Sequence, residues 1–284
     1  MNFFVFLFIL GFLLVLYLLC LKPNNTRTAR MQAYEKVYIA HRGLFDKARA
    51  PENSLEAFRR AVNGGFGIEL DVQLTADGKL VVFHDESLKR MCGVARKVHK
   101  CNYRELCQYR LLDTQEKIPL LEEVLRLVGG KVPMIIEVKP EGNPIRTAKE
   151  LSRQMKGYQG EYCVESFDPR VLYWYRKHDP EIIRGQLSTN FWRHENNRSW
   201  YVKVGLTNLL TNFYAKPDFI AYNYKYASQI SLQICRHLYH TEMVAWTVRS
   251  PEELEQARDS FHVFIFDGFI PVDKAKIEKC EISG

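Results

Sequence analysis

The sequence predicts a TIM-type (β/α)8 barrel that follows one apolar N-terminal segment. Two observations lead to this fold class. From residue 37 onward, short apolar runs rich in β-branched residues alternate with amphipathic stretches, which is the pattern of a parallel sheet covered by helices. The chain has 284 residues, of which 46% are hydrophobic, so it is long enough for one barrel and can bury a core.

Residues 1–21 are expected to form a membrane anchor. The run Phe3–Leu21 has no charged residue and is close to the roughly 20 residues that a helix needs to cross the hydrocarbon core. A cleaved signal peptide fits less well, because no lysine or arginine precedes the run and no small-residue cleavage pattern follows it. An uncleaved transmembrane helix is therefore the favoured interpretation.

The charges that follow the apolar run predict its orientation. Lys22, Arg27 and Arg30 come directly after it, and the positive-inside rule places such residues in the cytoplasm. We therefore expect a single-pass protein of the cell membrane with its globular part in the cytoplasm. The expected division is an anchor at 1–21, a polar linker at 22–36 and one barrel domain at 37–284.

Nine runs are candidate strands, one more than a barrel needs. They are short, continuously apolar and rich in β-branched residues, as in strands that are covered on both faces. Asp77-Gly78 joins the second and third runs as tightly as a hairpin does, so this part of the barrel is expected to be irregular. The nine runs are Val37–His41, Gly67–Thr75, Leu80–His84, Val132–Lys139, Tyr162–Phe167, Ile183–Leu187, Phe219–Tyr222, Met243–Val248 and Val263–Phe266.

Three of the expected helices have clear terminal signals. Asn53 is a good N-cap for a helix at Ser54–Asn63, and Ser250 is one for a helix at Pro251–Ser260. A helix at Leu120–Val128 ends at a pair of glycines. By contrast, residues 189–212 have no clear period, and we expect a long connection there, with a lid over the active site as one option.

Polar residues stand at the ends of the first four strands. The strand ends of a barrel meet at its active-site face, so these side chains are expected to lie together. A buried acid is costly unless it is paired or binds a metal. The residues in question are His41 and Arg42, then Glu69 and Asp71, then His84, then Glu137 and Lys139.

Three of these residues form a candidate metal site. Glu69 and Asp71 are two apart, so on a strand they point to the same face. With Glu137 they make an oxygen-rich set without cysteine, which suits Mg²⁺ or Ca²⁺ rather than zinc. Salt bridges to Arg42 and Lys139 are the simpler interpretation, but three acids against two bases leave one buried charge uncompensated.

The remaining polar residues suit the cleavage of a phosphodiester. His41 and His84 can act as a general acid and base, although either one alone would more often be a hydrogen-bonded core histidine. Arg42 and Lys139 can neutralise a phosphate.

The order of these motifs resembles that of the glycerophosphodiester phosphodiesterases. Any one of the motifs would be weak evidence, but five in the right order are specific. The resemblance runs from about residue 37 to residue 271, and Phe261–Pro271 departs from the family pattern. The five motifs are His41-Arg42-Gly43, Pro51-Glu52-Asn53-Ser54, Glu69-Leu70-Asp71-Val72, His84-Asp85 and Glu137-Val138-Lys139.

The resemblance implies a barrel that hydrolyses glycerophosphodiesters to an alcohol and sn-glycerol 3-phosphate, with a divalent cation as cofactor. By position, Glu69, Asp71 and Glu137 match the family's metal ligands, and His41 and His84 match its acid–base pair. Arg42 and Lys139 match phosphate-contacting residues. Glu52 matches a polar residue near the metal and the glycerol end, Trp246 a late aromatic residue of the pocket, and Asp267 a late aspartate.

Other functions stay open at this point. The anchor and the aromatic residues of 189–212 make a lysophospholipase D acting on membrane lysophospholipids credible. A phospholipase C-like or sphingomyelinase D-like phosphodiesterase shares this style of barrel, and a binding protein without turnover would be expected to lack one of the histidines or acids. The net charge of +7 is dispersed and comes with no nucleic-acid motif, so no nucleic-acid partner is expected. The seven cysteines include no C-x-x-C pair, which argues against a disulfide framework and a zinc site.

Overall fold

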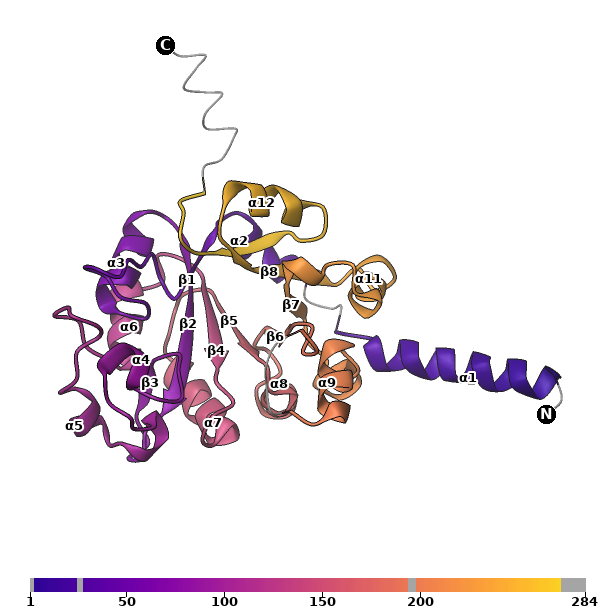
Figure 1. Ribbon diagram of the computed structural model, residues 1–284, viewed down its shortest axis with the longest axis horizontal. Coiled ribbons are helices and arrows are strands. Elements are labelled where there is room, and N and C mark those ends of the chain that lie inside the picture. The colour runs from indigo at the N-terminus through magenta and orange to yellow at the C-terminus, as the bar shows by residue number, and fades with distance from the viewer. Residues whose placement is uncertain (1–2, 25–27, 194–197, 272–284) are drawn as a thin grey trace, which may run out of the picture.

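The computed structural model describes residues 3–24, 28–193 and 198–271 (Figure 1). Its centre is a ring of eight parallel strands, which closes because β1 pairs with both β2 and β9. The predicted TIM-type barrel is therefore confirmed, and all nine predicted strands overlap observed ones. The ring consists of β1 (Ile39–His41), β2 (Gly67–Leu74), β4 (Met134–Val138), β5 (Tyr162–Ser166), β6 (Arg184–Ser188), β7 (Phe219–Asn223), β8 (Glu242–Val248) and β9 (Val263–Phe266).

The extra strand is half of a hairpin. β3 (Leu80–Val82) lies outside the ring and pairs antiparallel with β2. Gly78 in the connecting turn has φ of +78°, a conformation that glycine adopts at little cost. The hydroxyl of Thr75 donates to Asp77 Oδ1 at 2.6 Å and braces the turn. The irregularity expected around Asp77-Gly78 is thus a hairpin turn, after which β3 pairs antiparallel with β2 outside the ring.

The residues between β3 and the outer helix that begins at Leu121 form a small subdomain with its own core. It contains α4 (Lys89–Cys92), η2 (Val98–Lys100) and α5 (Tyr103–Leu106). Phe83, Met91 and other apolar residues of this stretch are buried together. This packing fixes the residues that directly follow β3, among them His84.

Helices surround the barrel, and the three that were predicted are present. The cap of α3 differs from the prediction: the N-cap is Ser54, whose hydroxyl accepts from the N–H of Ala57 at 3.1 Å. The side chain of Asn53 instead donates a hydrogen bond to Asp71. The outer helices are α3 (Leu55–Asn63), α6 (Leu121–Val128), α7 (Pro144–Met155), α8 (Pro169–His178), α9 (Trp200–Thr207), α10 (Asn212–Ala215), α11 (Ile230–His237) and α12 (Pro251–Arg258), with a short η3 (Tyr224–Tyr226) before α11.

The connection between β6 and β7 is more ordered than expected. Instead of an unpatterned loop over residues 189–212, it contains α9 and the start of α10. α9 has the sequence WYVKVGLT, in which aromatic and β-branched residues lower the helix propensity. Apolar residues also lie all around this helix, so the sequence shows no helical period.

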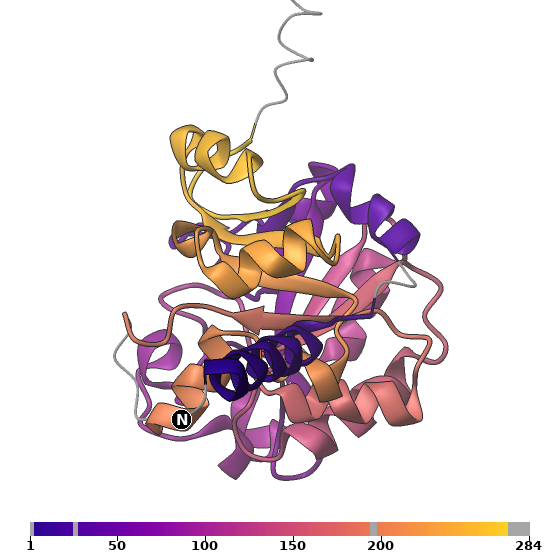
Figure 2. The same cartoon turned by 90° about the vertical axis from the view of Figure 1, so that its right-hand side faces the viewer.

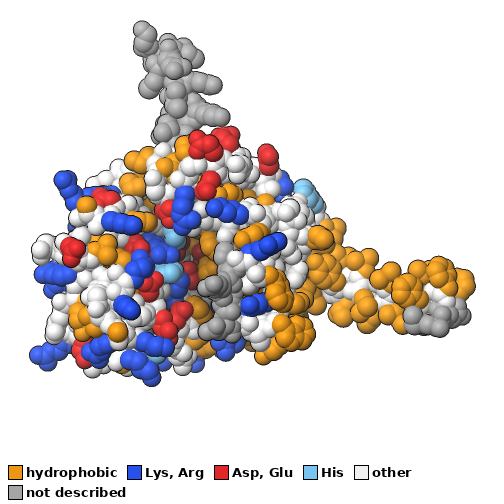
Figure 3. Space-filling view, viewed as in Figure 1, with side chains coloured by type: hydrophobic (Ala, Val, Ile, Leu, Met, Phe, Trp, Pro, Cys, Tyr) orange, Lys and Arg blue, Asp and Glu red, His pale blue; other side chains and the backbone are white. Residues whose placement is uncertain are grey.

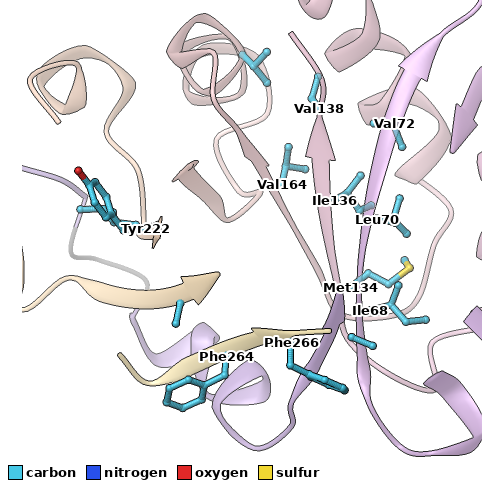
Figure 4. Packing of buried hydrophobic residues seen from close by; sticks show 14 of the residues in the cluster. Ile68, Leu70, Val72, Met134, Ile136, Val138, Val164, Tyr222, Phe264 and Phe266 are labelled. Atoms are coloured by element: carbon cyan, nitrogen blue, oxygen red, sulfur yellow. The ribbon is translucent and has the colours of Figure 1, made fainter. Parts of the chain in front are cut away.

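Alternate residues of each strand face two different parts of the core. In Figure 4 the outward-facing side chains of two adjacent strands lie against the helices; they are Ile68, Leu70 and Val72 of β2 and Met134, Ile136 and Val138 of β4. Since side chains alternate along a strand, Glu69, Asp71 and Glu137 point into the barrel instead. The alternation of side chains along the strands thus places three carboxylates inside the barrel.

Residues that precede β1 close the amino-terminal end of the barrel. η1 (Thr28–Met31) and α2 (Gln32–Glu35) lie in the stretch 22–36, which was expected to be a polar linker. Met31 and Tyr34 are fully buried and belong to the same core cluster as Ile39 at the start of β1. Where it is described, this stretch is therefore packed on the barrel and does not act as a free spacer.

The N-terminal helix α1 (Phe3–Leu21) projects away from the barrel (Figures 1 and 2). Among the described residues it is the one helix that is long and apolar enough to cross a membrane. Its last turn is docked on the barrel: Asn212 Nδ2 donates to the carbonyl of Leu21 at 3.1 Å, and the hydroxyl of Tyr239 donates to that of Leu18 at 2.7 Å.

Candidate active site

Three carboxylates converge inside the carboxyl end of the barrel. Glu69 and Asp71 come from β2 and Glu137 from β4, and the strand register places Asp71 beside Glu137. One oxygen from each of the three lies within 4.8 Å of the others. All three side chains are buried. The predicted acidic triad is therefore assembled as one compact group.

Two cations lie against this triad. Lys139 Nζ lies 2.9 Å from Glu137 Oε1 and 3.3 Å from Asp71 Oδ1. Arg42 Nε lies 3.4 Å from Asp71 Oδ2, and the backbone N–H of Arg42 donates to Glu69 Oε2 at 3.0 Å. The ion pairs that were the simpler interpretation of these residues are thus present. Two basic side chains do not neutralise all three carboxylates, however.

Oxygen atoms of the triad remain available for a metal. Asp71 Oδ1 and Glu137 Oε1 both face the Lys139 ammonium, and no other hydrogen-bond donor among the described residues reaches either oxygen. Three buried carboxylates beside two basic side chains leave one negative charge uncompensated, which is costly and which a divalent cation would neutralise. An all-oxygen donor set is the kind that Mg²⁺ and Ca²⁺ prefer. The residues present therefore fit a hard divalent cation.

The environment gives the three acids different affinities for protons. Burial, reinforced by Asp71 and Glu137, raises the pKa of Glu69 well above its ordinary value. Burial would also raise the pKa of Asp71, but Lys139, His84 and Arg42 outweigh it and hold that pKa well below the usual range. Burial raises the pKa of Glu137 despite the charge of Lys139. Such crowding of like charges is typical of a site that a cation completes.

Asn53 and Arg42 reach the triad from the loop after β1. Both residues have positive φ, at 58° and 57°, which is uncommon for residues other than glycine. In this conformation Asn53 Nδ2 donates to Asp71 Oδ2 at 2.8 Å. Since such backbone conformations cost of order 1–3 kcal/mol, they indicate that the loop is shaped for the site. The sequence reasoning gave Asn53 only a capping role.

His41 lies at the end of β1, between the triad and the last strand. Its Nδ1 lies 3.1 Å from Asp267 Oδ2, and its Nε2 lies 3.9 Å from Glu69 Oε2. Asp267 also binds Arg249, with Nε 3.0 Å from Oδ1. Burial lowers the pKa of His41, although the hydrogen bond to Asp267 works in the opposite direction.

His84 is held by a chain of ionic contacts on the other side of the site. Its Nδ1 lies 2.6 Å from Asp85 Oδ1, and Arg90 Nε lies 2.7 Å from Asp85 Oδ2. Arg90 also binds Glu52, with Nη2 2.7 Å from Oε1, and Arg42 Nη1 lies 2.7 Å from the same oxygen. Glu52 therefore joins the two arginines and lies beside the triad, not on the helix cap that was its alternative role. Arg90 was not predicted.

The opposite wall of the site is aromatic. Trp246 on β8 packs edge-on against Phe167, with ring centroids 5.7 Å apart. Together with the polar residues they enclose a cavity of about 150 Å³, whose lining includes His41, His84 and Glu137. Figure 3 shows acidic, basic and histidine side chains around a hollow on this face. All nine predicted site residues thus lie in or directly beside one cavity.

Glu165 is a fourth acid of this cavity that the sequence reasoning missed. It lies on β5 in register with Glu137 and is almost completely buried. Its Oε2 accepts no hydrogen bond from the described residues. Burial, together with Glu137 and Asp71, raises its pKa well above the ordinary value. The available signal was an acid inside an otherwise apolar strand.

A second, larger hollow adjoins the cavity. It has a volume of about 470 Å³ and lies between the start of α8 and α9. Phe167 lines both spaces, so the two meet at this ring. The groove is lined mainly by apolar and aromatic groups, among them Tyr201, Leu206 and Tyr214, with Arg170 and Arg198 beside them.

Comparison with known proteins agrees with this geometry. Residues 41–267 match the glycerophosphoryl diester phosphodiesterase family. The chain belongs to this family. The matched range begins at His41, the last residue of β1, and ends at Asp267, so it includes every residue of the site.

Two curated members of the family have clear sequence similarity to the chain. A glycerophosphodiester phosphodiesterase of Caldanaerobacter subterraneus is 43% identical over 168 residues, which cover 52% of this chain and 65% of the relative. The lysophospholipase D of Homo sapiens is 32% identical over 167 residues, covering 54% of this chain and 52% of that protein. The chain thus spans less than two thirds of the length of these relatives.

Solved structures of the family share the fold. A glycerophosphodiester phosphodiesterase from Thermotoga maritima is 28% identical with a TM-score of 0.63, covering 81% of this chain and 94% of that one. A phosphodiesterase from Oleispira antarctica, solved with the product sn-glycerol-3-phosphate, is 22% identical with a TM-score of 0.67 and covers 89% and 99%. The second likeness shows a shared fold.

Proposed function

We propose that this chain is a metal-dependent phosphodiesterase that hydrolyses glycerophosphodiesters to an alcohol and sn-glycerol 3-phosphate. The observation that carries the proposal is the meeting of three carboxylates, two histidines and two cations in one cavity of the barrel. These are the groups that cleavage of a phosphodiester needs: charge neutralisation, an acid and a base. The similarity to the glycerophosphodiester phosphodiesterase of Caldanaerobacter subterraneus supports the same reaction.

Glu69, Asp71 and Glu137 are the proposed metal ligands. Their oxygens suit Mg²⁺ or Ca²⁺, and either ion when bound would polarise a phosphoryl oxygen and neutralise its charge. Lys139 favours the ionised forms of Asp71 and Glu137, and Arg42 anchors Glu69 through its backbone N–H. The protein thereby fixes the ligand set before a cation arrives.

His41 and His84 are the proposed acid–base pair. An ionised carboxylate can only accept, so Asp267 and Asp85 hold a proton on Nδ1 of each histidine and leave Nε2 to accept or to give a proton. In hydrolysis one imidazole takes a proton from the attacking oxygen, which forms its bond to phosphorus. The other, in its imidazolium form, gives its Nε2 proton to the alcohol oxygen as the phosphorus–oxygen bond breaks.

The remaining predicted residues would bind the substrate. Arg42 and Lys139 are the closest cations for phosphate oxygens, and a guanidinium can bind two of them at once. Glu52, held by Arg42 and Arg90, is the proposed acceptor for the glycerol hydroxyls. Trp246 and Phe167 form an apolar wall against which the carbon skeleton can pack.

A single-chain lipid phosphodiester is a second candidate substrate. The apolar groove of about 470 Å³ meets the catalytic cavity at Phe167 and is of a size that holds small-molecule ligands. A hydrocarbon chain could lie there while its phosphodiester occupies the cavity. The relative named lysophospholipase D supports this activity, in which the head group is released from a lysophospholipid.

We also propose a membrane location for the chain. α1 is proposed as an uncleaved single span of the cell membrane, with the barrel on the cytoplasmic side because of the positive residues that follow it. The proposed division remains an anchor at 1–21 and a barrel domain at 37–284. The intervening residues 22–36 contribute to the barrel through Met31 and Tyr34.

The test uses the full chain in detergent, because truncation near residue 33 would remove the buried Met31. Glycerophosphocholine and lysophosphatidylcholine are assayed side by side with Mg²⁺, with Ca²⁺ and with EDTA. The His41→Ala variant is compared with His178→Ala, which changes an exposed histidine outside the cavity.

Each outcome has a distinct meaning. Metal-dependent release of glycerol 3-phosphate that only His41→Ala abolishes supports the proposal. Turnover of lysophosphatidylcholine alone supports the lipid candidate with the same catalytic groups. Release of a cyclic phosphate in place of glycerol 3-phosphate would instead favour phospholipase C-like or sphingomyelinase D-like chemistry. No turnover of any diester would favour a binding protein.

A further inference from the structure

Exposed apolar side chains gather in one part of the barrel domain. Outside α1, the described residues include eight large hydrophobic side chains that are exposed, and six of them lie between residues 192 and 238. Trp200 is 69% exposed and Ile230 is 70% exposed. We refer to the six as the apolar face: Trp192, Trp200, Tyr201, Phe213, Ile230 and Leu238.

This apolar face surrounds the base of α1. Its residues lie on or next to α9, α10 and α11, and α1 packs against α10 and α11. Figures 1 and 2 place α9 and α11 on the side from which α1 projects, and Figure 3 shows hydrophobic side chains over α9 and around the base of α1. Whatever surrounds α1 therefore lies close to this face.

The length of α1 leaves little room between the barrel and a bilayer. Its 19 residues measure roughly 28 Å at about 1.5 Å per residue, against a hydrocarbon core of about 30 Å. The last turn is bound to the barrel through the carbonyls of Leu18 and Leu21. A helix that spans a bilayer in this arrangement holds the apolar face at the lipid head groups.

The stretch of chain that contains the apolar face has a net positive charge, which suits an anionic surface. The stretch 189–241 has six lysines and arginines and two acids, and so carries four of the chain's seven net positive charges. One of the acids, Asp218, is buried against Arg184. Lys203 lies over the ring of Trp192, with Nζ 5.7 Å from the centroid. Basic side chains between aromatic ones are typical of surfaces at the membrane interface.

We infer that the apolar face is a second membrane contact, which lies in the head-group region of the bilayer that α1 spans. The inference rests on the proposed membrane span of α1 but not on the proposed catalysis. It fixes the orientation of the barrel as well as its distance from the lipid. The groove beside Tyr201 then opens near the bilayer surface, where an amphiphilic substrate is concentrated.

Tryptophan fluorescence provides the test. The chain has four tryptophans and α1 has none, so quenching by lipid reports on the barrel. The full chain is reconstituted in vesicles of phosphatidylcholine and phosphatidylserine, with and without phosphatidylcholine brominated on its acyl chains. Trp192→Phe/Trp200→Phe is compared with Trp174→Phe, which changes a half-buried tryptophan of α8 outside the apolar face.

Brominated lipid is expected to quench the wild type and Trp174→Phe strongly, and the double variant is expected to lose most of this quenching. Circular dichroism and the melting temperature in detergent show that each variant is folded. Carbonate-resistant flotation with the vesicles tests the span itself. A chain that floats but has no quenching, or keeps it in the double variant, overturns the inference. A chain that does not float overturns the span and this inference together, while turnover in detergent reports on the catalytic proposal separately.

Discussion

His41 and Asp267 are 226 residues apart in the chain, and their side chains meet at 3.1 Å between Nδ1 and Oδ2. The contact exists because the barrel closes: β1 pairs with β9, and the register Ala40 to Phe266 puts the next two residues side by side. A carboxylate in this position fixes the tautomer and the orientation of an imidazole. The carboxyl ends of the first and last strands thus bring together one pair of side chains in the site.

Replacing this carboxylate is expected to slow catalysis. Asp267→Asn keeps the shape but can donate a hydrogen bond to Nδ1 of His41 and so stabilise the tautomer that is protonated on Nε2. We expect kcat to fall by between about 10-fold and 10⁴-fold, the range that loss of an orienting carboxylate produces elsewhere. Steady-state kinetics with a soluble diester measure kcat and KM separately.

The control for this change is Asp113→Asn, which neutralises an exposed carboxylate outside the cavity. It should leave kcat and the melting temperature unchanged. If kcat of Asp267→Asn equalled that of the control, Asp267 would have no part in orienting His41.

Metal binding is expected to stabilise the fold, because a cation relieves repulsion among Glu69, Asp71 and Glu137. A ligand at 100 times its Kd stabilises the native state by about 2.7 kcal/mol. Glu69→Gln removes one charge and one ligand, so the variant should melt no lower than the wild type in EDTA. It should also lose most of the rise that Mg²⁺ or Ca²⁺ gives the wild type, which thermal unfolding in detergent measures.

Glu122→Gln is the matched control, since Glu122 is exposed on α6. Its melting temperature should respond to each cation as the wild type does. An equal response of Glu69→Gln would exclude Glu69 as a ligand, and the ion with the larger effect on the wild type would decide between Mg²⁺ and Ca²⁺.

The sequence predicts the site residues that lie on strands, because residues two apart on a strand face the same side. Glu69 and Asp71 share a face because they are two apart, and the apolar residues around them indicate a buried strand. Glu137 and Lys139 follow the same logic on β4. Their convergence then follows from the fold class, because parallel strands of a barrel end at one face.

Other features depend on contacts that no local pattern contains. Ser54 and Asn53 are both good caps, and the three-dimensional position of Asp71 decides that Asn53 binds it and Ser54 caps α3. Arg90 belongs to the subdomain after β3, whose packing alone brings it to Glu52. The helix α9 was missed because tertiary packing overrides its weak propensity.

Stability is expected to depend on a buried ion pair at the other end of the barrel. Asp218 accepts from the backbone N–H of Arg184 at 3.0 Å and lies 3.7 Å from its guanidinium. Both side chains are almost fully buried. Asp218→Ala would leave a buried charge without its carboxylate, which costs about 3–5 kcal/mol. For a domain of this size the melting temperature should fall by roughly 6–20 °C.

Asp259→Ala provides the comparison, because Asp259 is exposed at the end of α12. An exposed substitution of this kind changes stability by less than about 0.5 kcal/mol. Circular dichroism during heating distinguishes the two variants. Equal melting temperatures would mean that other groups satisfy Arg184 without Asp218.

Arg90 is expected to be a positioning residue for His84. It binds Asp85 through Nε at 2.7 Å and Nη2 at 2.9 Å, and Asp85 in turn holds His84 Nδ1. The same guanidinium makes two contacts with Glu52. Its side chain is 48% exposed, so these ion pairs contribute little to stability. We expect these ion pairs to act on the geometry of the site, because the planar guanidinium of Arg90 fixes the positions of two carboxylates, Asp85 and Glu52.

Arg90→Ala should therefore lower kcat by about 10-fold or more, as loss of supporting hydrogen bonds does at other sites, while the melting temperature changes little. Arg90→Lys should restore little activity, since an ammonium lacks the planar fork that binds both carboxylates. Arg104→Ala, at an exposed position of the same subdomain, is the control and should match the wild type. Full activity of Arg90→Ala would show that Asp85 orients His84 unaided. A large fall in melting temperature would instead assign Arg90 a structural role, because positioning alone predicts that stability and kcat respond separately.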